Sequence, residues 1–73
     1  MQNATTDSAT QSPVDDATYD LLQALTSKLE AIEAYQLYAE DEEVRDVFER
    51  LGRDEVQHAE VLLQALRQRL ANR

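Results

Sequence analysis

The sequence contains no cysteine, and it has only one glycine, one proline and one histidine in 73 residues. Without cysteine the chain forms no disulfide bond, and zinc-finger and iron–sulfur sites, whose usual ligands are thiolates, are excluded. A chain of this length buries a small core, so it is normally stabilised by disulfides, a bound metal or self-association. With disulfides excluded, a metal or a second copy of the chain remains as the source of that stability.

Positive charge is also scarce. The sequence has seven Lys and Arg residues and fifteen Asp and Glu residues, which gives a formal net charge of −8. Nucleic acids select basic surfaces, so we expect no nucleic-acid partner for this acidic chain. Long apolar runs are lacking, as are the basic and apolar regions of a signal peptide, so we expect no membrane association. These absences predict a cytoplasmic protein.

Residues 1–11 are small and polar, with no large apolar side chain after Met1. Such a segment buries too little surface to offset the entropy lost on ordering. We therefore predict a disordered tail over residues 1–11 and one folded unit over residues 12–73. The tail is either an inert solvated segment or a docking peptide for a partner.

The folded unit opens with a helix-start signal in which Ser12 suits the N-cap and Pro13 suits the first helical position. Helical spacing of apolar residues then predicts a first helix from Pro13 to Glu40. Its stripe is apolar apart from one lysine and consists of Leu21, Leu25, Lys28, Ile32, Tyr35 and Ala39.

A second helix is predicted after an acidic link at residues 40–43, with Asp41 as its N-cap. Its stripe consists of Val44, Val47, Phe48, Leu51, Glu55, His58, Leu62, Leu66 and Leu70. The short link makes the two helices an antiparallel hairpin. Each stripe is too wide for one partner helix to cover. We therefore predict an all-α fold in which two hairpins form a four-helix bundle, as a homodimer or a higher even oligomer.

The most specific motif is Glu55-x-x-His58, which places a carboxylate and an imidazole on one helical face where both can bind one ion. Together with Phe48-Glu49-Arg50-Leu51 before it and the run from Ala31 to Glu40, the motif resembles half of a ferritin-like or rubrerythrin-like bundle. The resemblance is closest to the encapsulated ferritin-like proteins, which are single hairpins that dimerise. It covers roughly Leu21 to Leu66.

This resemblance implies a pair of iron ions at the dimer interface, ferroxidase activity that oxidises ferrous to ferric iron, and a location inside a protein compartment. Glu55 and His58 match metal ligands of the family, and Tyr35 matches the tyrosine near the site. The family has a further ligand glutamate seven residues before that tyrosine, where this chain has Lys28. Glu33, at the edge of the first stripe, is the substitute ligand to consider.

Lys28 leaves two hypotheses open, because a protonated lysine cannot donate to a metal ion and repels it. In the first, the chain is a ferritin-like iron-binding protein, and a ferroxidase-type oxidoreductase if the site is intact. In the second, it is a metal-free helical assembly or interaction module without a cofactor. Lys28 then replaces the ligand glutamate and pairs with Glu55, and His58 is a core histidine hydrogen-bonded to Glu55 or Tyr35. A hairpin symmetric about Asp41 and Glu42 would put Lys28 level with Glu55.

Overall fold

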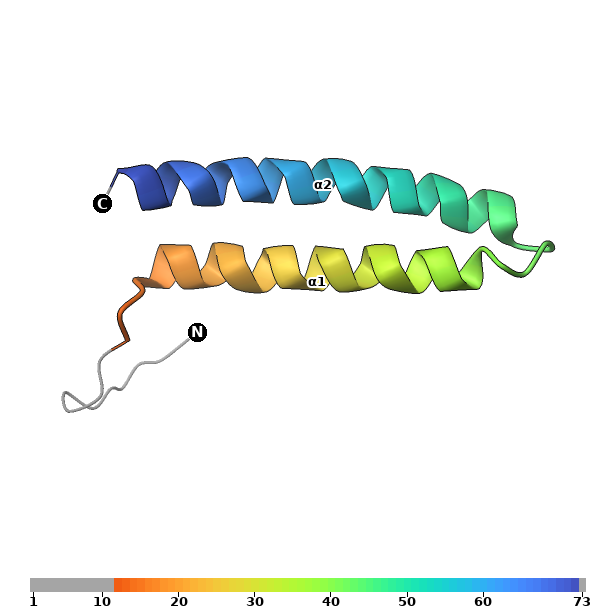
Figure 1. Ribbon diagram of the computed structural model, residues 1–73, viewed down its shortest axis with the longest axis horizontal. Coiled ribbons are helices and arrows are strands. Elements are labelled where there is room, and N and C mark those ends of the chain that lie inside the picture. Colours follow the sequence, from red (N-terminus) through yellow and green to blue (C-terminus); the bar gives the residue numbers. More distant parts are fainter. Residues whose placement is uncertain (1–11, 73) are drawn as a thin grey trace.

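The computed structural model describes residues 12–72, which form two antiparallel helices joined by a link (Figure 1). Helix α1 spans Asp16–Tyr38 and helix α2 spans Arg45–Ala71. The start of α1 and the end of α2 lie at one end of the molecule, and the link lies at the other (Figure 1). The predicted all-α hairpin is confirmed. The predicted disordered tail at residues 1–11 lies outside the described residues.

The N-cap of α1 is Asp15, so the prediction that Ser12 caps a helix beginning at Pro13 was wrong. One carboxylate oxygen of Asp15 accepts a hydrogen bond from the backbone N–H of Thr18 at 2.9 Å, as an N-cap requires. The hydroxyl of Ser12 instead accepts from the backbone N–H of Val14 at 3.1 Å, which forms a local turn.

The link spans residues 39–44 and is longer than the predicted 40–43, because α1 ends at Tyr38 and not at the predicted Glu40, and because Asp41 does not cap α2. Its carboxylate accepts from the backbone N–H of Glu43 at 3.0 Å. This bond to the residue two positions on closes a turn within the link, as Asp side chains commonly do. The N-cap of α2 is Val44, which makes no side-chain capping bond.

Arg45, the first residue of α2, ties the link to the end of α1. Its guanidinium Nε donates a hydrogen bond to the backbone carbonyl of Ala39 at 2.9 Å. Carbonyls at a helix C-terminus lack partners within the helix and carry the negative end of its dipole. Arg45 therefore supplies the cation that the last turn of α1 lacks.

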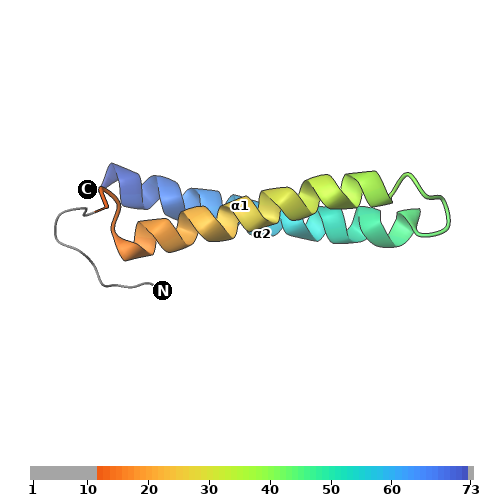
Figure 2. The same cartoon turned by 90° about the horizontal axis from the view of Figure 1, so that it is seen from below.

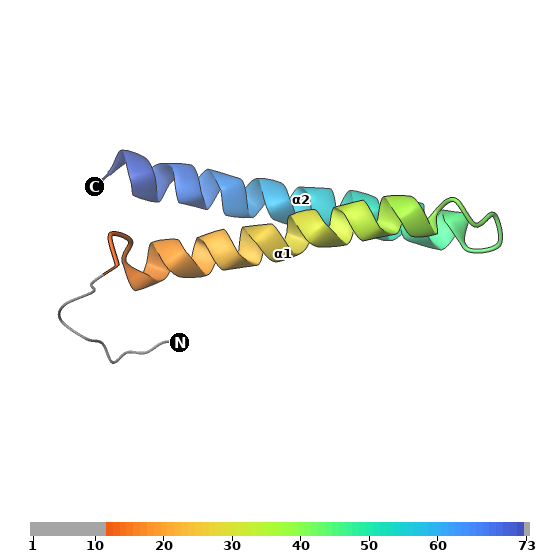
Figure 3. The same ribbon diagram turned by 60° about the horizontal axis from the view of Figure 1, so that its bottom comes forward.

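The two helices make a single layer, as Figures 2 and 3 show. The molecule measures 52 × 24 × 13 Å, and its shortest dimension is about the diameter of one helix. Its radius of gyration of 16.3 Å exceeds the roughly 11 Å of a compact domain of this length. Stable domains normally pack at least two layers. Both broad faces of this hairpin therefore lack a covering layer within residues 12–72.

Burial of apolar side chains is correspondingly slight. Among the described residues only two apolar side chains are buried, those of Ala59 and Leu66, and each is 7% exposed. Helices of this kind normally gain their stability from packing of an apolar face. The exposed large apolar residues are Tyr19, Leu22, Leu29, Leu37, Tyr38, Val44, Val47, Leu51, Val56, Val61, Leu63 and Leu70. The hairpin alone thus leaves much of its apolar surface uncovered.

Neither α1 nor α2 combines the length and the apolar character needed to cross a bilayer.

Candidate functional site

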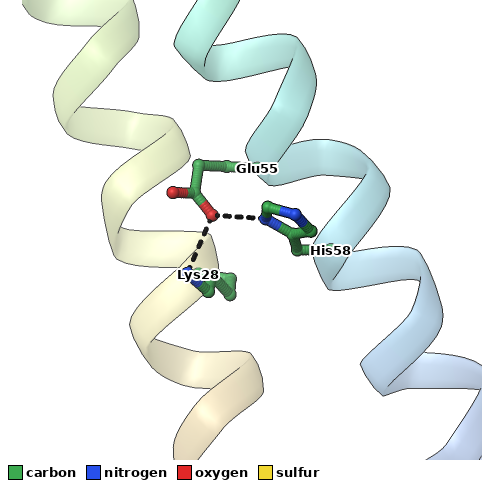
Figure 4. Close-up of polar contacts among 3 residues, drawn as sticks. All are labelled: Lys28, Glu55 and His58. Carbon is green, nitrogen blue, oxygen red and sulfur yellow. Dashed lines mark hydrogen bonds and ion pairs between the residues drawn. The ribbon is translucent and has the colours of Figure 1, made fainter.

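The centre of the hairpin holds an ion pair between Lys28 of α1 and Glu55 of α2 (Figure 4). The lysine Nζ lies 3.0 Å from the carboxylate Oε1 of Glu55. The Lys28 side chain is 36% exposed and the Glu55 side chain 18%, so the pair lies partly buried between the helices. The prediction that Lys28 lies level with Glu55 along the hairpin is confirmed. The apolar stripe of each helix therefore contributes one charge, and the two charges meet.

His58 approaches the same oxygen from within α2. Its Nδ1 lies 3.3 Å from Oε1 of Glu55, one helical turn away, and Figure 4 shows both contacts reaching one carboxylate oxygen. The predicted contact with Glu55 is present, but the imidazole is 61% exposed. Within the hairpin, His58 is therefore not the core histidine that we expected, because it projects from the side of α2.

The charge on Glu55 is stabilised by these neighbours. The hydrogen bond from the Lys28 ammonium, followed by that from His58, holds the pKa of Glu55 below its ordinary value, although partial burial opposes the shift. Glu55 is therefore an anion at neutral pH with a cation already beside it. A metal ion at this carboxylate would compete for the same oxygen and meet the repulsion of the ammonium group.

The described part of the chain contains no group of three or more His, Cys, Asp or Glu residues that could hold a metal ion. Glu55 and His58 form a pair of neighbouring ligand atoms, and the structure does not bring Glu33 to them. Glu33 is exposed on α1. The register puts it more than a turn nearer the link than Lys28 and Glu55. A complete metal site would therefore need ligands from a second copy.

Tyr35 belongs to an aromatic cluster near the link. Its ring centroid lies 5.5 Å from that of Phe48 and 6.4 Å from that of Tyr38, and the rings of Tyr38 and Phe48 are 5.1 Å apart in an edge-on arrangement. Such pairs contribute beyond simple burial of area. Among residues 12–72, no hydrogen bond joins Tyr35 to Glu55 or His58. Tyr35 therefore packs the two helices together near the link.

A second charged contact closes the opposite end of the hairpin. Arg69 of α2 donates a hydrogen bond to Asp15, with 2.8 Å between its guanidinium nitrogen and the carboxylate Oδ2. Hydrogen bonds from the side chain and backbone of Thr18, and then that from Arg69, lower the pKa of Asp15 to about 2. Helical spacing did not predict this contact, because Arg69 lies 54 positions along the chain from Asp15.

An open groove runs between the helices near the link, lined mainly by Ile32, Tyr35, Gln36, Phe48, Gly52 and Val56. A Cβ atom at Gly52 would find its nearest neighbour, the Cβ of Tyr35, at 3.9 Å, which is ordinary van der Waals contact. The glycine is therefore not imposed by a close approach of the helices. Its effect is to leave space for another group in the groove.

Comparison of the chain with protein-family models, curated proteins and solved structures finds no match. The similarity to ferritin-like proteins therefore rests on the motifs of the sequence alone.

Proposed function

We propose that this chain is a metal-free helical assembly module, a hairpin that pairs with a second copy to complete a four-helix bundle. The observation that carries the proposal is the 3.0 Å ion pair between Lys28 and Glu55. It occupies the position at which the ferritin-like resemblance implies a bound metal. Lys28 neutralises the carboxylate that an iron ion would otherwise need as a ligand, so the two helices are joined there without a metal.

The uncovered apolar surface supports self-assembly. A single helical layer with two buried apolar side chains among residues 12–72 has little core of its own. A second hairpin laid on one broad face would cover that face of both copies and create the missing second layer. A symmetric pair is the simplest closed assembly that does this.

A second candidate function is the iron-binding one, and the position of His58 favours it. Its imidazole is 61% exposed and lies 3.3 Å from Oε1 of Glu55, so two potential ligand atoms are neighbours at one side of α2. Two copies meeting there would bring four ligands together, and Lys28 would have to swing away. Iron held in this way could support ferroxidase chemistry if a coordination position stayed open for oxygen.

An anaerobic titration with ferrous iron, read by equilibrium dialysis, separates the two candidates. The proposal predicts that the wild-type chain retains no iron above the level of a His58→Ala variant. It also predicts that Lys28→Glu, which restores the carboxylate implied by the resemblance, gains iron binding, whereas the control Lys28→Gln does not. Stoichiometric binding by the wild type that His58→Ala abolishes would overturn the proposal in favour of the iron-binding function.

A further inference from the structure

The two broad faces of the hairpin carry different side chains of α2. Val56 lines the groove, and His58 follows it by two residues. Two residues correspond to about 200° of rotation on an α-helix, so these side chains leave α2 on opposite sides. We call the side with Val56 and Gln36 the groove face, and the side with His58 the histidine face.

A ridge of exposed leucines continues the groove face towards the open end of the hairpin. Leu63 follows Val56 by seven residues, and Leu22 precedes Gln36 by fourteen, a spacing that keeps side chains on one helical face. Leu22 is 39% exposed and Leu63 is 37% exposed. The groove face therefore has a hollow near the link and an apolar ridge, made of Leu22 and Leu63, near the other end.

The hollow and the ridge are placed symmetrically about the middle of each helix. On α2, Gly52 in the groove and Leu63 on the ridge are centred between residues 57 and 58, and the helix is centred on residue 58. On α1, Gln36 in the groove and Leu22 on the ridge are centred on residue 29, and the helix is centred on residue 27. A two-fold axis that lies between the two facing copies and crosses the helices at right angles near their middle would seat each ridge in the other copy's groove, with the helices fully overlapped.

Charge favours the same arrangement. Residues 40–50 around the link carry six acidic side chains and two arginines, whereas at the open end Arg67 and Arg69 of α2 accompany three acidic residues at the start of α1, Asp15, Asp16 and Asp20. Two copies with their links at opposite ends keep the acidic links apart. Each link then lies beside the less acidic open end of the other copy, with Arg67, which has no carboxylate partner among the described ion pairs, near the level of Glu49.

The groove face is also large enough for a stable contact. The broad side of the hairpin measures 52 by 24 Å, and a standard interface buries roughly 800 Å² on each partner. We propose that a second copy of this chain docks antiparallel on the groove face, with its Leu22–Leu63 ridge in the groove beside Gly52. This inference rests on the proposed assembly function and specifies its interface. A metal-bridged dimer would instead have to meet through the histidine face.

Engineered cysteines test this docking, since the chain has none of its own. Gly52→Cys and Leu63→Cys are made as separate variants, refolded alone or together, and oxidised mildly. Positions 52 and 63 lie about 16 Å apart along one helix, far beyond disulfide reach, so only an antiparallel pair of chains can join them. We expect a disulfide-linked dimer in the mixture. Each variant oxidised alone should cross-link only to the background extent of the control Val61→Cys, whose position is 69% exposed.

Other cross-linking patterns overturn the inference. Self-linking of Gly52→Cys, or of Leu63→Cys, would mean that the links lie at the same end. Self-linking of His58→Cys with no linking in the mixture would assign the interface to the histidine face. A dimeric wild type with no cross-link in the mixture would reject the docking and leave the assembly function standing. A monomeric wild type, measured by light scattering, would reject both.

Discussion

Lys28 and Glu55 face each other at the middle of the hairpin, with 3.0 Å between Nζ and Oε1. They are the two charged residues at the interior positions of otherwise apolar stripes, one from each helix. The Nδ1 atom of His58 lies 3.3 Å from the same carboxylate oxygen. Charge compensation within the hairpin thus accounts for a glutamate that would be costly to place between the helices by itself.

Replacing Lys28 with Met should raise the pKa of Glu55, because it removes the hydrogen bond that contributes most to the lowered value while preserving an apolar stem of similar length. The pKa is followed by NMR of the side-chain carboxyl carbon during a pH titration. The matched control, Lys28→Arg, keeps the cation and should keep the pKa low. An unchanged pKa in Lys28→Met would mean that the two residues are not paired in solution.

Acid should weaken the hairpin through Asp15. Its folded pKa of about 2 lies below the ordinary 3.8, so its contribution to stability is present above about pH 4 and is lost as the pH falls towards 2. Thermal melts followed by circular dichroism between about pH 6 and about pH 2 measure the loss. Asp15→Asn retains an N-cap oxygen without the charge and should show a smaller loss across this range than the wild type. Equal acid sensitivity in both would assign the effect to other carboxyl groups.

Leu66 should contribute far more to stability than an exposed leucine. It is 7% exposed, whereas Leu37 is 62% exposed. Leu66→Ala removes buried methyl groups and should destabilise the fold by about 2–5 kcal/mol, while Leu37→Ala should change it by less than about 0.5 kcal/mol. Urea unfolding compares the two, and Leu66→Met provides a milder replacement that should remain folded. Equal losses from the two alanine variants would contradict the described packing of α2.

His58→Ala should leave the metal-free protein almost as stable as the wild type, within about 0.5 kcal/mol, because the imidazole is mostly exposed and its described contact is with Glu55 alone. Urea unfolding in the presence of a chelator measures this. A much larger loss would indicate that His58 is buried in the assembly, which would make the histidine face the interface between copies.

The sequence predicted the two helices and the register at their centre for identifiable reasons. Apolar spacing defined both stripes, and the symmetry of the hairpin about Asp41 and Glu42 placed Lys28 level with Glu55, as the ion pair confirms. The helix ends were less accurate. Ser12, Asp15 and Asp41 are all suitable capping residues, and which of them caps a helix depends on the conformation of the backbone around each one.

The exposure of His58 and the groove at Gly52 could not be read from spacing alone. Helical periodicity places His58 on the stripe, but whether a side chain at the edge of a stripe is covered depends on how much of that edge the neighbouring helix reaches. Likewise, a glycine inside a helix predicts equally a close contact or an open space. The 3.9 Å neighbour distance at Gly52 distinguishes the two.

The central claim is that the hairpin assembles without a metal, and the molar mass in the presence of a chelator tests it most directly. Sedimentation equilibrium of the full chain, first with EDTA and then with ferrous iron under anaerobic conditions, gives the mass in each state. We expect twice the 8.3 kDa chain mass, or a higher even multiple, in EDTA, with no change on adding iron. A monomer in EDTA that associates only when iron is added would contradict it.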